Sequence, residues 1–239
     1  MLARLLRRSI RTWVRPLCQL CRLPISELSA QTFLMPEPIW CSSCLAHFQP
    51  TPRCQRCGIA TLHDVEQCGS CLSQPPPWHR LYCLGDYQYP FNQLIHQLKY
   101  QGQFWLATDI ANQLAVQISE PAPLITPVPL HYYRRWSRGF NQSAALATPL
   151  AKQLQSQYHP TLFRRTRHTL AQKGLNREAR QTNLKTAFTL TAPPNTEHVA
   201  IVDDVVTTGS TVALLAQLLL DSGVKNIDIY CVCRTPEPS

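Results

Sequence analysis

The chain has 239 residues and a mass of 27.1 kDa, which fits one large domain or two smaller ones. Hydrophobic residues make up 44% and charged residues 15%, so disorder throughout the chain is excluded. No stretch approaches eighteen uncharged apolar residues, and we therefore expect no membrane-spanning helix. Arg7, Arg8 and Arg11 interrupt the apolar residues near the N-terminus, so we expect no signal peptide.

The positive charge is concentrated in one segment. Residues 131–180 contain ten Lys and Arg against the single acid Glu178, which accounts for the whole net charge of +9. Arginine predominates in the chain, and its planar guanidinium suits bidentate binding of phosphate. The segment is either an anion-binding surface or a solvated basic surface.

Paired cysteines dominate the first third of the chain. Eight of the eleven cysteines form four C-x2-C pairs. In a chain without a secretory signal, close pairs favour metal thiolates in a reducing compartment over disulfides. We therefore expect a cytoplasmic zinc protein.

Four such pairs supply two tetrahedral zinc sites. Sequential pairing is favoured, an interleaved cross-brace is the alternative, and both sites are expected to be structural rather than redox or catalytic. Cys83, Cys231 and Cys233 are expected to pack in the core, and His47, His63 and His79 are not needed as ligands. The sequential sites are Cys18, Cys21, Cys41 and Cys44, and Cys54, Cys57, Cys68 and Cys71.

Three consecutive prolines at 75–77 predict an extended linker and a domain boundary near residue 76. Residues 1–76 would form a basic N-terminal segment and a Cys-rich module, and residues 77–239 an α/β domain. Apolar runs predict strands at 124–129, 198–204 and 226–233. Between the last two strands, Val212, Leu215, Ala216 and Leu219 recur at helical spacing.

The most specific motif is VAIVDDVVTTGST, residues 199–211. A strand ends in two acids, and a Thr-Thr-Gly turn then opens a helix, where open α/β sheets bind ligands. Unsatisfied N–H groups of the first helical turn suit a phosphate, which Gly209 allows to approach closely. Asp203 and Asp204 suit a neutral diol such as ribose hydroxyls. Together they predict a ribose 5-phosphate site. The alternative is a capped helix with two surface acids. Hydroxyl groups that add donors to the phosphate site are those of Thr207, Thr208, Ser210 and Thr211.

This segment resembles the phosphoribosyl pyrophosphate (PRPP) motif of type I phosphoribosyltransferases. Together with the paired cysteines, three further segments resemble the ComF/GntX family of competence and DNA-utilisation proteins: LKYQG at 98–102, PVPLHYYRRWSRGFNQ at 127–142, and the run from 170 to 188. The resemblance implies a type I phosphoribosyltransferase-like domain with a central parallel sheet, preceded by a small double zinc ribbon. It also links the protein to the DNA-uptake machinery and the use of imported DNA.

The resemblance further implies roles for individual residues. Asp203 and Asp204 would hold the ribose 2′ and 3′ hydroxyls, and 207–211 the 5-phosphate. The loop at 129–138 would face pyrophosphate, and the segment 167–180 would be a mobile lid over PRPP and Mg²⁺. The cations in these two segments, which would equally suit a DNA backbone, are Arg134, Arg135, Arg138, Lys173, Arg177 and Arg180.

Three functions are compatible with these features: a phosphoribosyltransferase of unknown acceptor, a PRPP sensor without catalysis, and a zinc-dependent adaptor that binds single-stranded DNA. For the adaptor, Trp13, Trp40 and Phe48 would either stack on bases or pack in the interior. Asn141 and Gln142 are either polar contacts or helix caps.

Overall fold

The computed structural model describes residues 16–25, 39–130, 140–165 and 187–236. The predicted Trp13 and the six cations of the segments 129–138 and 167–180 lie outside these residues. The chain forms two compact units, Met1–Gln49 and Pro50–Ser239. Residues 50–76 thus group with the residues that follow them, while the domain boundary near residue 76 stays a prediction.

In the first unit, the described residues form a turn at 19–21, a short helix α2 (Ser42–Leu45) and the 3₁₀ turn η1 (Ala46–Phe48). Trp40 and Phe48 are buried and stack with ring centroids 4.5 Å apart. Of the two interpretations for these rings, buried packing is therefore confirmed, and neither is available to stack on a base.

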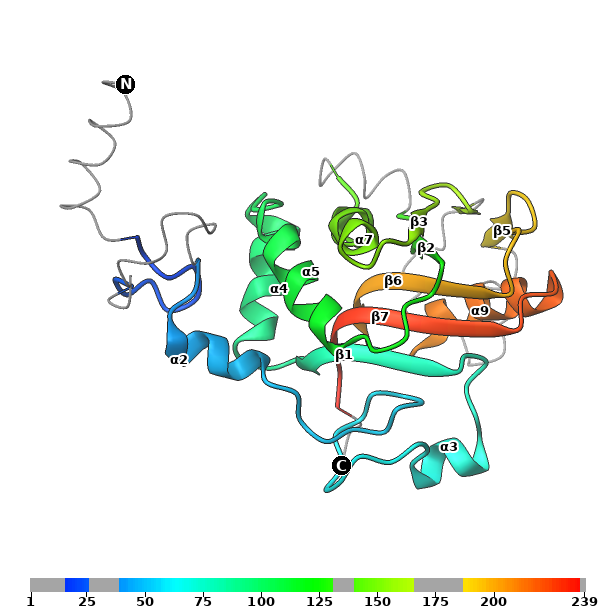
Figure 1. Cartoon of the computed structure of the whole chain (residues 1–239), viewed down its shortest axis with the longest axis horizontal. Helices are drawn as coiled ribbons and strands as arrows, with labels where there is room; N and C mark the ends of the chain where they lie inside the picture. Colours follow the sequence, from blue (N-terminus) through cyan, green and yellow to red (C-terminus); the bar gives the residue numbers. More distant parts are fainter. Residues whose placement is uncertain (1–15, 26–38, 131–139, 166–186, 237–239) are drawn as a thin grey trace, which may run out of the picture. The chain divides into compact units, whose positions relative to one another are not determined.

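A five-stranded parallel sheet forms the centre of the second unit, in the order β1-β7-β6-β2-β3 (Figure 1). A two-stranded antiparallel sheet, β4-β5, lies beside it. The central strands are largely buried, as expected when helices cover a parallel sheet. Their bounds are β1 (Arg80–Asp86), β2 (Leu124–Pro127), β3 (Gln157–Tyr158), β4 (Phe163–Arg165), β5 (Phe188–Leu190), β6 (His198–Val206) and β7 (Asn226–Arg234).

Helices surround this sheet. The helices α5 (Leu106–Gln117) and α7 (Gln142–Gln153) contact one another and the sheet (Figure 1). The helix α4 (Phe91–Tyr100) packs at β1 and β7 beside α5, and a five-residue helix α3 (Gly69–Ser73) lies in the cysteine segment. Among the described helices, none is long and apolar enough to cross a membrane.

The predicted strand–loop–helix–strand unit is confirmed as β6, the helix α9 (Ser210–Asp221) and β7. The apolar stripe of α9 faces Val199, Ile201 and Ile229, together with the β4-β5 strands, in one core cluster. Because side chains alternate along a strand, Ala200 and Val202 point to the other face. This packing fixes the end of β6 and the start of α9, where the candidate motif lies.

The three cysteines outside the pairs are buried, Cys83 on β1 and Cys231 and Cys233 on β7. Their predicted role in core packing is confirmed. The fold prediction is likewise confirmed in its main features, a central parallel sheet with a preceding Cys-rich region.

Candidate functional site

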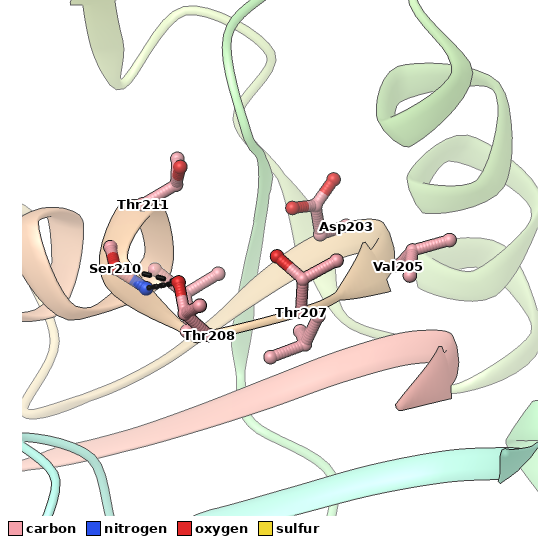
Figure 2. Close-up of a pocket in the computed structure, with 9 residues that line it drawn as sticks. Asp203, Val205, Thr207, Thr208, Ser210 and Thr211 are labelled. Atoms are coloured by element: carbon pink, nitrogen blue, oxygen red, sulfur yellow. Dashed lines mark hydrogen bonds between the residues drawn. The ribbon is translucent and has the colours of Figure 1, made fainter. Parts of the chain in front are cut away.

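A small polar cleft opens where β6 ends and α9 begins (Figure 2). The Asp203 carboxylate and the hydroxyls of Thr207 and Thr211 turn toward the same space in this cleft. The structure therefore brings together Asp203 and all five residues of the predicted phosphate turn. The lining residues are Asp203, Val205, Val206, Thr207, Thr208, Gly209, Ser210, Thr211 and Val212.

Gly209 sets the geometry of the turn. Its backbone is left-handed, with φ 75° and ψ 0°, a conformation that glycine adopts without steric cost. Its carbonyl accepts the first helical bond from Ala213 N at 2.8 Å, so Gly209 is the N-cap of α9. The N–H groups of the following turn are left without helical partners and carry partial positive charge at the cleft.

Most hydroxyl side chains of this turn are exposed, and two of them are held in place by hydrogen bonds. Thr208 Oγ1 lies 2.7 Å from Ser210 Oγ and accepts a 3.4 Å hydrogen bond from Ser210 N (Figure 2). Thr207, Thr208 and Ser210 are exposed, and Thr211 is partly buried. Hydroxyl and amide donors of this kind surround phosphate groups at helix N-termini.

Asp203 is held in a defined orientation. Its Oδ1 accepts hydrogen bonds from Ser143 Oγ at 3.0 Å and from Asp204 N at 2.9 Å. Burial, reinforced by the negative charge of Asp204, raises the pKa of Asp203 to about 7, while the bonds from Asp204 N and Ser143 and the charge of Lys99 oppose this shift. The carboxyl therefore changes between a proton donor and an acceptor near neutral pH.

Asp204 differs from its neighbour. Its Oδ1 lies 2.9 Å from Lys99 Nζ, and the side chains of this pair are 11% and 20% exposed, respectively. Asp204 does not line the described cleft. The two acids that the sequence treats alike are thus placed differently: one faces the cleft, and the other is neutralised by a lysine from α4.

Two residues of this site were missed by the analysis of the motif itself. Ser143 belongs to α7 and Lys99 to α4, and the fold brings both to the end of β6. Lys99 lies in the segment LKYQG, to which the family resemblance assigns no role, whereas no signal in the sequence marks Ser143.

The structure shows which of the two predicted roles, polar contact or helix cap, Asn141 takes. Its Oδ1 accepts a 3.1 Å hydrogen bond from Ser143 N, which makes it the N-cap of α7, and its Nδ2 donates to Val128 O at 3.0 Å. Gln142 is buried in the first turn of α7. The capping interpretation is therefore confirmed for Asn141, which also ties α7 to the segment after β2.

The eight paired cysteines form two groups, in each of which the four Sγ atoms lie within 4.8 Å of one another. The sequential pairing is the one observed: Cys21 and Cys41 Sγ are 3.8 Å apart, and Cys57 and Cys68 Sγ are 3.7 Å apart. Zn–S bonds of about 2.3 Å in a tetrahedron place sulfurs about 3.8 Å from each other. Both groups are therefore compatible with zinc.

Main-chain amides support both groups in the same way. Cys41 N donates to Cys18 Sγ at 3.4 Å, and Cys68 N donates to Cys54 Sγ at 3.2 Å. Such bonds stabilise thiolate, the form that binds metal. His79 Nδ1 instead accepts from Ile227 N at 3.1 Å. Among the described residues, cysteines alone make up the two groups.

The chain is similar to a known domain family and to several named proteins. The sequence model of the Phosphoribosyl transferase domain family matches residues 140–239, which include the cleft. "DNA utilization protein YhgH" of Escherichia coli (strain K12) is 40% identical over 230 residues, covering 92% of this chain and 97% of the relative. Its counterpart in Salmonella typhi is 42% identical over 228 residues, with the same coverage. "Competence protein F" of Haemophilus influenzae is 35% identical over 206 residues, covering 81% and 90% of the two chains.

Proposed function

The chain belongs to the ComF/GntX family of competence and DNA-utilisation proteins, and from this premise we propose that its phosphoribosyltransferase domain binds PRPP or ribose 5-phosphate in the cleft at the end of β6. The observation that carries the proposal is the left-handed Gly209 turn with an oriented Asp203 carboxylate beside it. One end of the cleft offers N–H and hydroxyl donors to a phosphate, and the other offers an acceptor to a ribose hydroxyl.

The two acids take different parts in this proposal. Asp203 lines the cleft and accepts from a ribose hydroxyl, while Ser143 keeps its carboxylate oriented. Asp204 is paired with Lys99. It accepts from a second ribose hydroxyl only if Lys99 moves away or if the carboxylate bonds to the lysine and the hydroxyl together. The order of importance for ribose is therefore Asp203 before Asp204.

If the domain transfers phosphoribosyl groups, pyrophosphate leaves the anomeric carbon as an acceptor attacks it. This reaction needs positioning and charge stabilisation rather than a side-chain nucleophile. The Asp203 carboxylate is an oxygen ligand of the kind that Mg²⁺ accepts, and such an ion, if bound with PRPP, would supply positive charge near the pyrophosphate. The chain's own residues would hold the phosphate and the ribose in place.

Two measurements test this function. Titration calorimetry with ribose 5-phosphate, and with PRPP and Mg²⁺, tests binding, and inorganic phosphate added as a competitor tests the phosphate end of the cleft. Pyrophosphate release from PRPP in the presence of candidate bases tests transfer. Release above background supports a transferase, and binding without release supports a sensor. Lack of binding of either sugar phosphate refutes the proposal.

We also propose that zinc occupies both cysteine groups and that its role is structural. All eight sulfurs are used as ligands, which leaves no open position of the kind a catalytic zinc needs. Because cysteine thiolates persist in a reducing compartment, we place the protein in the cytoplasm.

Binding of single-stranded DNA is a second candidate function, favoured by a group of exposed aromatic side chains. Tyr100, Phe104 and Trp105 are 63%, 60% and 54% exposed at the junction of α4 and α5. Phe104 contacts both Trp105 and Phe140, with ring centroids 5.7 and 6.1 Å away. Exposed rings of this kind stack on bases without sequence preference. The basic segment 131–139, which directly precedes Phe140 in the sequence, would supply charge for the backbone.

Fluorescence anisotropy with a labelled oligothymidylate tests this second function. Each neutralised phosphate on a single strand contributes about −0.7 to the slope of log affinity against log salt, so a steep slope is expected. Trp105→Ala should weaken binding about tenfold, the loss of one stacked base. Val116→Ala, at an exposed apolar position near the other end of α5, should not. Undetectable binding at low salt, or equal losses in both variants, contradicts the function.

A further inference from the structure

We propose that the second cysteine group holds the phosphate turn in shape, and that Arg234 and Trp78 are the positioning residues that connect the two. The second cysteine group is Cys54, Cys57, Cys68 and Cys71. The phosphate turn, 207–211, directly follows Val206 at the end of β6 and runs into the first turn of α9. The inference rests on the proposed function only in naming what the turn binds, because the physical connection is independent of any ligand.

Arg234 ends β7 and is 8% exposed. Its Nη1 donates to Val206 O at 3.2 Å, to Thr235 O at 3.0 Å and also to Thr207 O. Its Nε donates to Cys57 O at 3.2 Å. In the described part of the chain, this guanidinium therefore joins the carbonyls of the phosphate turn to a carbonyl of the cysteine group.

Trp78 makes the second connection. It is 5% exposed, and its Nε1 donates to Arg56 O at 2.6 Å. Its ring lies against the phosphate turn, since a Cβ added at Gly209 would come within 2.9 Å of Trp78 Cη2. The Trp78 ring thus packs directly against the left-handed Gly209.

Both connections end on adjacent carbonyls, those of Arg56 and Cys57, inside the turn that links the first two cysteines of the group. That turn closes through a 2.8 Å hydrogen bond from Gly58 N to Cys54 O, with Gly58 left-handed at φ 74°. A metal bound by Cys54 and Cys57 fixes both ends of the turn, and hence the directions of the two carbonyls. Without the metal, the acceptors of a buried cation and a buried indole lose their fixed positions.

The same turn is anchored to β1, so it does not move freely against the sheet. Leu81 N donates to Gln55 O at 2.8 Å, and Arg53 Nη1 donates to Asp86 Oδ1 at 2.7 Å and to Gly58 O at 2.8 Å. The side chain of Leu81 leaves no room for a Cβ at Gly58, where the separation would be 2.4 Å. The cysteine turn, β1, β7 and the phosphate turn therefore form one connected structure.

The test compares matched cysteine variants. Cys68→Ser and Cys41→Ser each remove the third cysteine of a group, and each replaced residue donates its N–H to the first cysteine of its own group. Hydrogen exchange is measured for amides at 205–212 and, as a reference, at 199–202 in the same strand. Cys68→Ser should speed exchange of the turn about tenfold, the equilibrium value of one hydrogen bond to a charged group, and the reference reports how much of any change comes from lower stability of the whole domain. Cys41→Ser should change neither.

Two further variants decide the case if Cys68→Ser does not fold. Arg234→Lys keeps the charge but loses the Nε donor to Cys57 O, and Trp78→Phe keeps a ring but loses the donor to Arg56 O. Each should speed exchange of the turn and, reciprocally, weaken zinc binding, so that more zinc is released at equilibrium to a chromogenic chelator. Release is measured with Cys41→Ser as background, so that the second group is the remaining four-cysteine site. Unchanged exchange and unchanged release in both variants overturn the inference.

Ligand binding is kept as a separate arm. Ribose 5-phosphate should reduce the zinc released at equilibrium from the second group in the Cys41→Ser background. If the sugar phosphate does not bind but the exchange results hold, the proposed function fails and the connection stands. If the sugar phosphate binds and neither exchange nor release responds to the variants, the function stands and the connection fails.

Discussion

The two cysteine groups share one chemistry and differ in what they contact. In the first, the described contacts are local: Gln19 N donates to Ile39 O at 2.8 Å, and Trp40 packs on Phe48. In the second, carbonyls of the cysteine turn accept from Arg234 and Trp78, which both reach the phosphate turn. The sequence alone makes the two four-cysteine groups look equivalent. Their contacts differ: the first group supports its own segment, and the second group supports a candidate binding site.

The largest effect that tests this comparison is on stability. Cys68→Ser should lower the free energy of unfolding of the α/β domain by about 3 kcal/mol, from one hydrogen bond to a charged group and one between neutral groups. Cys41→Ser should leave that transition unchanged. Denaturant unfolding followed by circular dichroism measures both, and metal analysis should find two zinc ions in the wild type and one in each variant. Equal losses of stability would make the two groups equivalent.

The phosphate turn itself offers the next largest effect. Gly209→Val should weaken ribose 5-phosphate binding by about a hundredfold or more, because the branched side chain strains a left-handed residue and strikes Trp78. Gly223→Val is the matched control, since Gly223 is also left-handed, at φ 97°, but has open space around its missing Cβ. Calorimetry of both variants separates the effect of backbone strain, which both share, from the effect of the clash at the cleft, which only Gly209→Val has. If Gly223→Val loses as much affinity, the loss at Gly209 does not report on the cleft.

The two acids give a smaller and more specific effect. At pH 8, Asp203→Asn should weaken ribose 5-phosphate binding roughly tenfold to a hundredfold, the value of a hydrogen bond to a charged acceptor. Asp204→Asn should weaken it less, because Asp204 does not line the cleft and is paired with Lys99. Unchanged affinity in both variants would leave the phosphate cradle in place but remove the acids from ribose binding. A larger loss at Asp204 would reverse their order.

The last effect is a pH dependence of stability. The pKa of Asp203 is raised from 3.8 to about 7 in the folded protein by burial and by Asp204, so the folded state holds this proton more tightly than the unfolded chain. Its contribution is fully present below about pH 4 and is lost as the pH rises through 7. Asp203→Asn should therefore gain stability over the wild type at pH 8 and lose that advantage at pH 4. A pH-independent difference contradicts the raised pKa.

The sequence was sufficient for features that depend on short spacing. The β6–α9–β7 unit and the position of the Thr-Thr-Gly turn follow from neighbours in the chain, and the structure confirms them. The sequence favoured sequential cysteine pairing over a cross-brace, and the two cysteine groups have the sequential pairing. The exposed aromatic group at α4 and α5 was not anticipated, because exposure depends on which helix face the fold leaves uncovered.

The rest depended on contacts between distant segments. Lys99 and Ser143 reach the acids only because α4 and α7 meet the end of β6. Trp78 follows a proline run that indicated a linker, and Arg234 belongs to none of the motifs in the sequence. Their roles arise from the fold: the pairing of β6 with β7 sets residues 206 and 234 side by side, and the Trp78 ring reaches Gly209 from the segment before β1. No spacing in the sequence encodes these contacts.

Calorimetric titration of ribose 5-phosphate into the wild type, Cys41→Ser and Cys68→Ser, side by side, tests the connection between the second cysteine group and the phosphate cleft most directly. We expect the wild type and Cys41→Ser to bind alike and Cys68→Ser to bind about tenfold more weakly, through the lost acceptor of Arg234. Equal affinity in all three proteins would contradict the connection, and no binding by the wild type would contradict the cleft itself.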